Sequence, residues 1–184
     1  GKDFHVVILD KPFERVVRLV KAVRIPAKKN KDDNVIDMSP LHKLAQEFNV
    51  GCCVIDFAPE QQKVRDFRAD EDFDVYGCIY QEHQRGTVSW DSLEGIVRVN
   101  RTEIHDATHD IVARKRLMLP RKSEEIDEFI REYCCTAKKL EEDESTGSKE
   151  YRYIKLGADH YRHVTNYAYL AWKRVGVYVS RGRN

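Results

Sequence analysis

The feature that most constrains this chain is a near-continuous apolar run, CCVIDFAP, over residues 52–59. Such a run predicts a strand that is buried on both faces, as in the centre of a sheet covered by helices, and parallel to a neighbour. Asp56 lies at its carboxyl end, the edge where ligands and catalytic groups collect in such sheets. A buried carboxylate there is costly unless it is paired or bound to a cation. Asp56 is therefore a candidate site residue, and the alternative is an Asx turn before Pro59.

A second candidate acid opens the last predicted helix. In the stretch KLGADHYRHVTNYAYLAW, residues 155–172, Gly157 ends a strand-like segment and Asp159 follows two residues later. Apolar residues then recur at helical spacing, as at Tyr161, Val164 and Ala168, which predicts an amphipathic helix with one buried face. A carboxylate in the first turn of a helix is favoured by the helix dipole. Asp159 is thus either an ordinary helix start or an acid brought to the same place as Asp56.

The bulk properties predict one α/β domain. A chain of 184 residues, 41% hydrophobic and 34% charged, is long enough for a single core beneath a charged surface. We assign the domain to residues 1–175 and a mobile basic tail to residues 176–184. The five cysteines form no zinc-binding pattern, and no apolar run could span a membrane, so we expect a cytoplasmic protein without a membrane partner.

The order of predicted elements is that of a mixed sheet flanked by helices. Two antiparallel strands come first, a helix leads to the buried strand, and a β-hairpin precedes the last helix. The predicted strands are 4–9, 16–25, the run 52–59, 75–80, 97–100, a strand end at 117–120, 137–141 and 150–154. The predicted helices are 35–48, 61–67, 103–113, 123–135 and the one that follows Asp159. The sequence has no phosphate-binding GxxxxGK[ST] loop, so nothing in it indicates an ATPase.

Four segments together resemble the nuclease domain of the large terminase subunit of tailed bacteriophages. They are VIDFAPEQQKV, VYGCIYQ, VNRTEIHDATHDIVARKRLMLP and KLGADHYRHVTNYAYLAW, and the resemblance runs from Phe4 to Trp172. It implies a ribonuclease-H-like fold with an additional hairpin. It also implies an endonuclease that cuts concatemeric viral DNA during genome packaging in the host cytoplasm, with double-stranded DNA, the terminase ATPase domain, the small terminase subunit and the portal as partners.

The resemblance also assigns roles to the acids. Asp56 and Asp159 match two of the family's catalytic acids, which hold two Mg²⁺ or Mn²⁺ ions for phosphodiester hydrolysis. Carboxylate oxygens suit these hard cations. The family's first acid is expected on a strand upstream of Gly1, and Asp3 would then be an accessory metal-binding acid beside the site.

Basic residues are segregated along the chain, although the net charge is only +1. Such segregation is compatible with a face that meets DNA phosphates, and equally with the solvated faces of ordinary elements. The candidate DNA-binding residues are Arg24, Lys28, Lys29, Arg101, Arg114, Lys115, Lys138 and Lys139. Two other functions remain open for such a fold: a non-catalytic DNA-binding or motor-contacting module, and a nuclease of the resolvase or integrase type.

Overall fold

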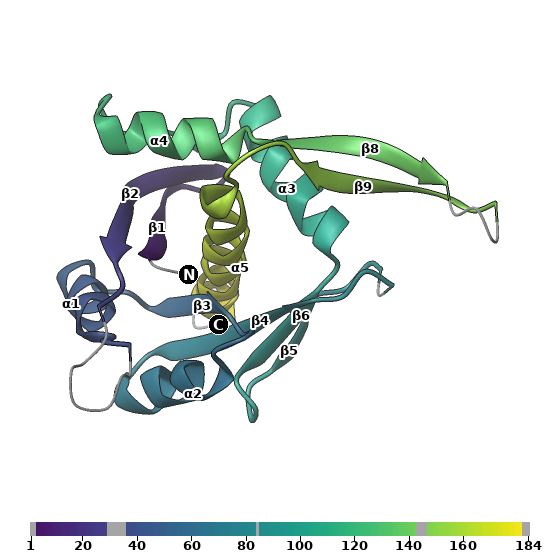
Figure 1. The fold of residues 1–184 in the computed structure, drawn as a ribbon. Helices are drawn as coiled ribbons and strands as arrows, with labels where there is room; N and C mark the ends of the chain where they lie inside the picture. The colour runs from purple at the N-terminus through teal and green to yellow at the C-terminus, as the bar shows by residue number, and fades with distance from the viewer. Residues whose placement is uncertain (1–2, 29–35, 84, 143–146, 182–184) are drawn as a thin grey trace.

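The structure, a computed structural model, describes residues 3–28, 36–83, 85–142 and 147–181, with side chains in the last segment up to residue 175. It is a mixed α/β fold in which a long C-terminal helix, α5 (His160–Arg181), lies against two separate sheets (Figure 1). The expected α/β class is confirmed. No described helix combines the length and the apolar composition needed to cross a membrane.

The first sheet is formed by the N-terminal hairpin. Strands β1 (Asp3–Phe13) and β2 (Val16–Pro26) are antiparallel, as predicted, and the short β7 (Leu117–Met118) pairs in parallel with β2. Alternate residues of β2, among them Leu19, face a core shared with α4 (Glu124–Tyr133) and the start of α5. Ser123 begins α4 as predicted, because its side chain accepts a hydrogen bond from the backbone of Ile126.

The second sheet carries the apolar run. Its order is β3 (Cys52–Asp56), β4 (Asp74–Tyr80), β6 (Ile96–Val99), β5 (Ser89–Asp91), parallel except for β5. The predicted parallel pairing of β3 is confirmed, but its central position is wrong among the described residues, where β3 pairs only with β4. Its apolar side chains are covered by packing between layers, with Cys52 and Val54 in the core beneath α5.

The remaining helices connect these strands. Helix α1 (Ser39–Glu47) begins later than predicted, and its N-cap is Met38 instead of Ser39. The Asp37 carboxylate accepts a 2.9 Å hydrogen bond from the Ser39 backbone, while residue 35, the predicted start, lies outside the described residues. Helices α2 (Gln61–Asp70) and α3 (Arg101–Ala113) follow their predicted positions closely, and α5 runs past residue 176, where the sequence predicts the tail to begin.

The predicted hairpin before the last helix is present. Strands β8 (Thr136–Glu142) and β9 (Lys149–Lys155) form a two-stranded antiparallel sheet that extends away from the body of the molecule (Figure 1). The charged tip predicted between them falls partly on residues 143–146, which lie outside the described residues. The last residue of β9 is only five residues before α5, so the hairpin leads directly into that helix.

One glycine of the second sheet is required by a close contact. A Cβ placed on Gly77 in β4 would lie 2.2 Å from a ring carbon of Phe57, a core residue. We therefore expect Gly77→Ala to lower the free energy of unfolding by about 1 to 3 kcal/mol, the range for overpacking a core. Urea denaturation measures this effect, with Gly51→Ala as a control because its Cβ would meet Val175 at an ordinary 3.8 Å. Equal stability of the two variants would contradict this packing.

Candidate functional site

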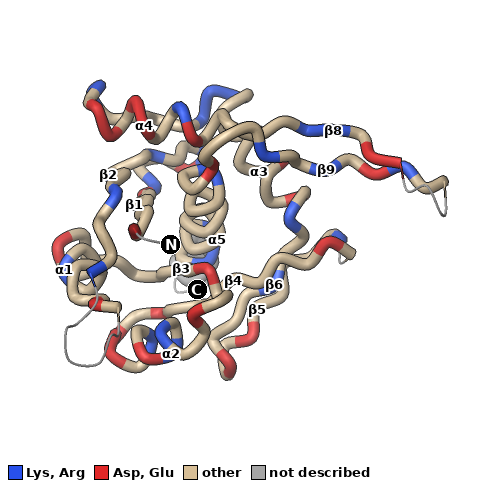
Figure 2. Tube along the Cα trace, viewed as in Figure 1, with Lys and Arg blue, Asp and Glu red and all other residues tan. Residues whose placement is uncertain are grey.

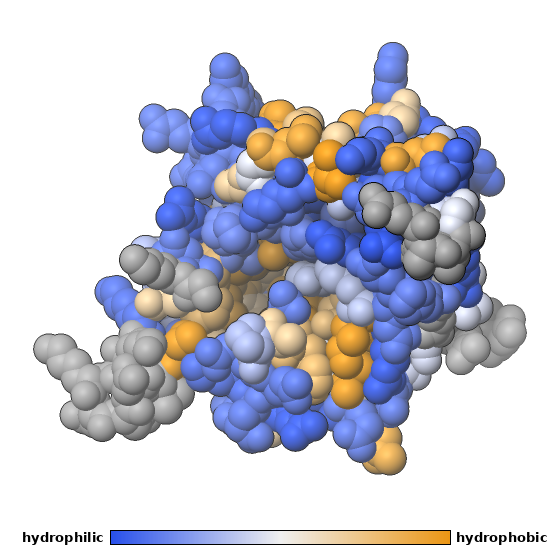
Figure 3. Space-filling model, turned by 45° about the vertical axis from the view of Figure 1, so that its right-hand side comes forward, coloured by the Kyte–Doolittle hydropathy of each residue, from blue (hydrophilic) through white to orange (hydrophobic). Residues whose placement is uncertain are grey.

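A cleft of about 1280 Å³ separates the two sheets. One wall is the free edge of β1, the other is the free edge of β3, and α5 contributes residues such as Tyr167 and Trp172. Among the described residues β1 pairs only with β2, and β3 pairs only with β4, so both edges keep unpaired backbone groups. Figure 3 shows a hollow in the middle of one face, with apolar side chains at its floor.

Asp159 lies directly before α5 and is buried. Its Oδ1 is 2.9 Å from Lys155 Nζ, and its Oδ2 is 3.3 Å from His163 Nε2. Burial acts to raise the pKa of this carboxyl, but the hydrogen bond from Lys155 and the charge of His163 prevail, and the pKa falls below its ordinary value. Asp159 is therefore held as a carboxylate with a nitrogen partner on each oxygen, which is more than a helix cap requires.

Asp56 is at the end of β3 and lines the cleft. Its side chain reaches solvent, but partial burial still raises the pKa of Asp56 above its ordinary value. Interactions with the Ala58 backbone and the Tyr167 hydroxyl lower the pKa, but their effect is smaller. Because Asp56 is exposed, the cost of burying an unpaired carboxylate that the sequence predicted here does not apply in full. The charge of His163 opposes the effect of burial and lowers the pKa of Asp56, as it does that of Asp159.

Side chains from β4 and α5 connect the two acids. The Tyr80 hydroxyl is 3.2 Å from His163 Nδ1, and the amide of Asn166 donates to the same hydroxyl at 3.1 Å. If Tyr80 donates to Nδ1, the His163 proton is on Nε2, where it points at Asp159. Tyr80 also packs against Tyr167, with 5.7 Å between the two ring centroids, and Tyr167 acts on the pKa of Asp56. Asp159 is thus connected to Tyr80 through His163, while Asp56 lies near Tyr167, which packs against Tyr80.

Behind this network is a buried basic residue that sequence reasoning missed. Arg162 is 2% exposed, and its Nε donates to His105 Nδ1 at 2.9 Å. Its guanidinium is 4.5 Å from the Tyr133 ring centroid, in a cation–π contact. Arg162 follows Asp159 by three residues, so this packing fixes the first turn of α5 and the backbone that carries the acid. The only signal in the sequence was the density of polar residues in ADHYRH.

His105 gives this buried region a testable pH dependence. Its side chain is fully buried, and burial with the nearby charges of Arg162 and His163 lowers its pKa from 6.5 to about 2. Between these values the unfolded chain binds a proton that the folded protein does not, so stability falls as the pH drops below 6.5. We expect a loss of about 1 to 2 kcal/mol between pH 7 and pH 5 from this residue.

Urea denaturation at both pH values measures this loss in the natural protein and in His105→Gln, which keeps a hydrogen-bond acceptor for Arg162. The variant is expected to lose less stability on acidification, although the pKa of His163 is also lowered by burial and contributes its own share. An equal loss in the two proteins would show that His105 is not held neutral.

The predicted accessory acid Asp3 pairs with Arg24, whereas Asp159 pairs with Lys155 and His163. Asp3 lines the cleft, but its Oδ2 accepts a 2.7 Å hydrogen bond from Arg24 Nε and forms an ion pair with Arg24 Nη2 at 2.6 Å. Arg24 also reaches Glu128 of α4, with 3.4 Å between their charged atoms. Asp3 and Arg24 therefore neutralise each other, and neither is free to act as the sequence predicted unless this pair opens.

The other predicted DNA-binding residues differ in their surroundings. Arg114 and Lys138 pair with Asp110 and Asp106, at 2.6 Å and 2.8 Å. Exposed positions are held by Lys28, Lys115 and Lys139, whereas Arg101, at the start of α3, has a buried Nε without a hydrogen-bond partner. Lys29 lies outside the described residues. Figure 2 shows acidic and basic residues interspersed along the hairpin and α4, so the basic residues do not form a single uninterrupted face there.

The donor chemistry of the two acids fits a hard divalent cation, since both offer carboxylate oxygens. The described residues include no group of three or more His, Cys, Asp or Glu side chains arranged to hold a metal ion. Asp56, Asp159 and His163 thus do not form such a group as they stand, and a metal site that used both acids would need a further ligand. Comparisons of this chain with family models, with curated proteins and with solved structures found no match.

Proposed function

We propose that this chain is a divalent-metal-dependent endonuclease that cuts double-stranded DNA by phosphodiester hydrolysis. The observation that carries the proposal is that Asp56, at the end of a parallel strand, and Asp159, before the packed helix α5, both act on the pKa of His163. A ribonuclease-H-like arrangement is supported by the antiparallel β1–β2 pair, the parallel β3–β4 pair and the helix across both sheets.

The two acids, His163 and Tyr80 have separate tasks in the proposed reaction. When bound, two Mg²⁺ or Mn²⁺ ions would supply an activated water and stabilise the leaving oxygen. Asp56 and Asp159 would bind these ions through carboxylate oxygens, and Asp159 is ready to do so because its low pKa keeps it ionised. His163 orients Asp159 through Nε2, while Tyr80 fixes the other ring nitrogen.

The further ligand would come from the cleft. The resemblance implies an acidic strand ahead of Gly1, and the cleft offers what such a strand needs: a free strand edge on each side and apolar side chains from α5. A strand placed there would be antiparallel to β1 and parallel to β3, and would join the two sheets into one. Because Asp56 ends β3 beside this cleft, an acid on the added strand would lie near it.

DNA would be held mainly through its phosphates. Exposed Lys28, Lys115 and Lys139 are suited to such contacts, which give affinity without sequence specificity. Arg101 lies closer to the acids, since its charge acts on the pKa of both His163 and Tyr80. By resemblance, the setting is viral genome packaging in the host cytoplasm, where the partners would be the terminase ATPase domain, the small terminase subunit and the portal.

A plasmid-nicking assay tests this proposal. The polypeptide is assayed with a start upstream of Gly1, so that the acidic strand is included, in Mn²⁺, in Mg²⁺ and in EDTA. We expect nicking and linearisation with a divalent ion, and none in EDTA. Intact supercoiled plasmid with both ions would overturn the proposal. Selective cutting of branched DNA over linear duplex would favour a resolvase-type nuclease instead.

A non-catalytic DNA-binding or motor-contacting module is the second candidate. The observation in its favour is that Asp159 is already paired with Lys155, and that the described residues supply no complete metal site. Binding of duplex DNA without any cutting, by the polypeptide that includes the upstream strand, would support this alternative.

A further inference from the structure

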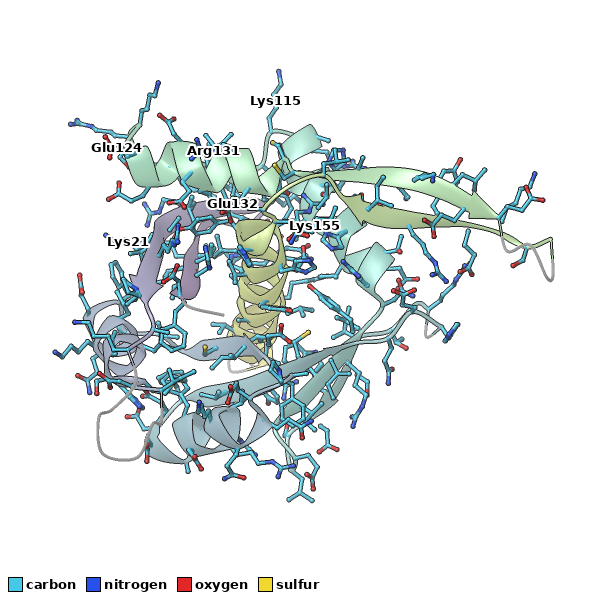
Figure 4. All side chains as sticks on the ribbon, viewed as in Figure 1. Lys21, Lys115, Glu124, Arg131, Glu132 and Lys155 are labelled. Atoms are coloured by element: carbon cyan, nitrogen blue, oxygen red, sulfur yellow. The ribbon has the colours of Figure 1, made fainter. Side chains whose placement is uncertain are left out.

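Lys155 places a positive charge directly on the candidate metal ligand Asp159. It is the last residue of β9, and its Nζ is 2.9 Å from Asp159 Oδ1. The side chains differ sharply in exposure, 57% for Lys155 and 6% for Asp159. The other carboxylate oxygen is 3.3 Å from His163 Nε2, so each oxygen of Asp159 already has a nitrogen partner. Figure 4 shows Lys155 beside the first turn of α5.

Lys155 and His163 would respond differently to a divalent cation that binds Asp159. His163 faces the other oxygen, Oδ2, through Nε2, and it can keep orienting the carboxylate when a cation binds at Oδ1. Lys155 is an ammonium ion, and two cations on the same carboxylate oxygen repel each other. Binding of a divalent cation at Oδ1 therefore favours departure of the ammonium group.

The structure allows Lys155 to leave by side-chain rotation alone. Its backbone is fixed by pairing with Thr136 across the hairpin, and the next residue, Leu156, donates a 2.9 Å hydrogen bond to Cys135. The side chain itself is largely in solvent, so the ammonium group can turn outward and be hydrated without disturbing β9 or α5. The ion pair between Lys155 and Asp159 can therefore open and close without unpacking the core.

We propose that Lys155 is an internal counter-ion of Asp159, which a divalent cation displaces when it binds, so that Lys155 sets the metal affinity of the site. This inference rests on the proposed metal site at Asp159. It assigns Lys155 a role that differs from phosphate binding: the residue competes with the cation for the same oxygen. Lys138 provides a matched comparison, because it lies on the same hairpin and makes a similar 2.8 Å ion pair with Asp106.

Titration with Mn²⁺, followed by the electron paramagnetic resonance signal of the free ion, tests the competition without any assay of cutting. We expect Lys155→Met to bind Mn²⁺ about two- to fivefold more tightly, the size expected for the loss of an exposed ion pair. Lys155→Arg is expected to bind as the natural protein does, because it keeps the competing charge. Lys138→Met is expected to leave the affinity unchanged, and Asp159→Asn to remove the binding.

The outcomes separate the inference from the proposed function. If Lys155→Met binds Mn²⁺ with unchanged or weaker affinity while Asp159→Asn abolishes binding, the counter-ion role is overturned and the metal site stands. If Asp159→Asn binds as well as the natural protein, both are overturned. Circular dichroism confirms folding of each variant, and Lys155→Gln replaces Lys155→Met in the comparison if the latter unfolds.

Discussion

Replacement of Asp159 or Asp56 by asparagine is expected to reduce DNA cleavage by more than about a hundredfold in the polypeptide that includes the upstream strand. The change keeps the shape of the side chain but removes the negative charge that would bind the divalent ion. Changes to groups that only support a metal ligand cost about 10- to 100-fold, so loss of a ligand itself should cost more. Initial rates of plasmid nicking in Mn²⁺ measure the effect.

Two further variants test whether the loss of cleavage comes from removal of a metal ligand. His163→Ala removes the group that orients Asp159 at 3.3 Å, and we expect an intermediate decrease of about 10-fold. Asp66→Asn changes an exposed aspartate of α2 and is expected to cut at the natural rate. If Asp56→Asn and Asp159→Asn retain more than a tenth of the natural rate while folded, these acids are not the metal ligands.

A strand placed in the cleft is expected to stabilise the protein by about 3 kcal/mol. The designed extension is TVTVDVTN, joined to Gly1 so that an asparagine–glycine pair forms the hairpin turn into β1. Burial of two or three apolar side chains contributes about 3 to 6 kcal/mol or more, before the cost of ordering the strand. Paired backbone groups on both edges add to this gain. Urea denaturation measures the difference in the free energy of unfolding.

The control extension, TVTPDPTN, has two prolines that remove backbone donors and prevent pairing. It should leave the stability of the chain unchanged. Trp172 lines the cleft, so the pairing extension should also shift its fluorescence to shorter wavelength, and Trp172→Phe identifies that part of the signal. Equal stability and equal emission with the two extensions would show that the cleft does not accept a strand.

The sequence predicted the elements of the site better than their assembly. A strand ending at Asp56 and a helix beginning next to Asp159 were both correct, because apolar periodicity and the glycine before the helix are local signals. The central place of β3 was wrong, since an apolar run reports burial of side chains and not the pairing of both strand edges. Cys52 and Val54 are buried although no other strand among the described residues pairs with the outer edge of β3.

The sequence also could not predict the contacts between the two acids, because these contacts depend on how the elements pack. Tyr80 and His163 are 83 residues apart in sequence, and their contact depends on how α5 crosses the second sheet. Arg24 was predicted to bind DNA from its local charge, but its pairing with Asp3 requires the antiparallel register of β1 and β2. Such pairings follow from the fold, and charge patterns along one chain do not reveal them.

The central claim is that Asp56 and Asp159 bind the same group of divalent ions. A crystal structure of the polypeptide that includes the upstream strand, with Mn²⁺ located by its anomalous scattering, tests this claim most directly. We predict Mn²⁺ coordinated by both carboxylates, with Lys155 turned away from Asp159. Ordered Asp56 and Asp159 carboxylates without Mn²⁺ on either one, in crystals saturated with the ion, would contradict the account.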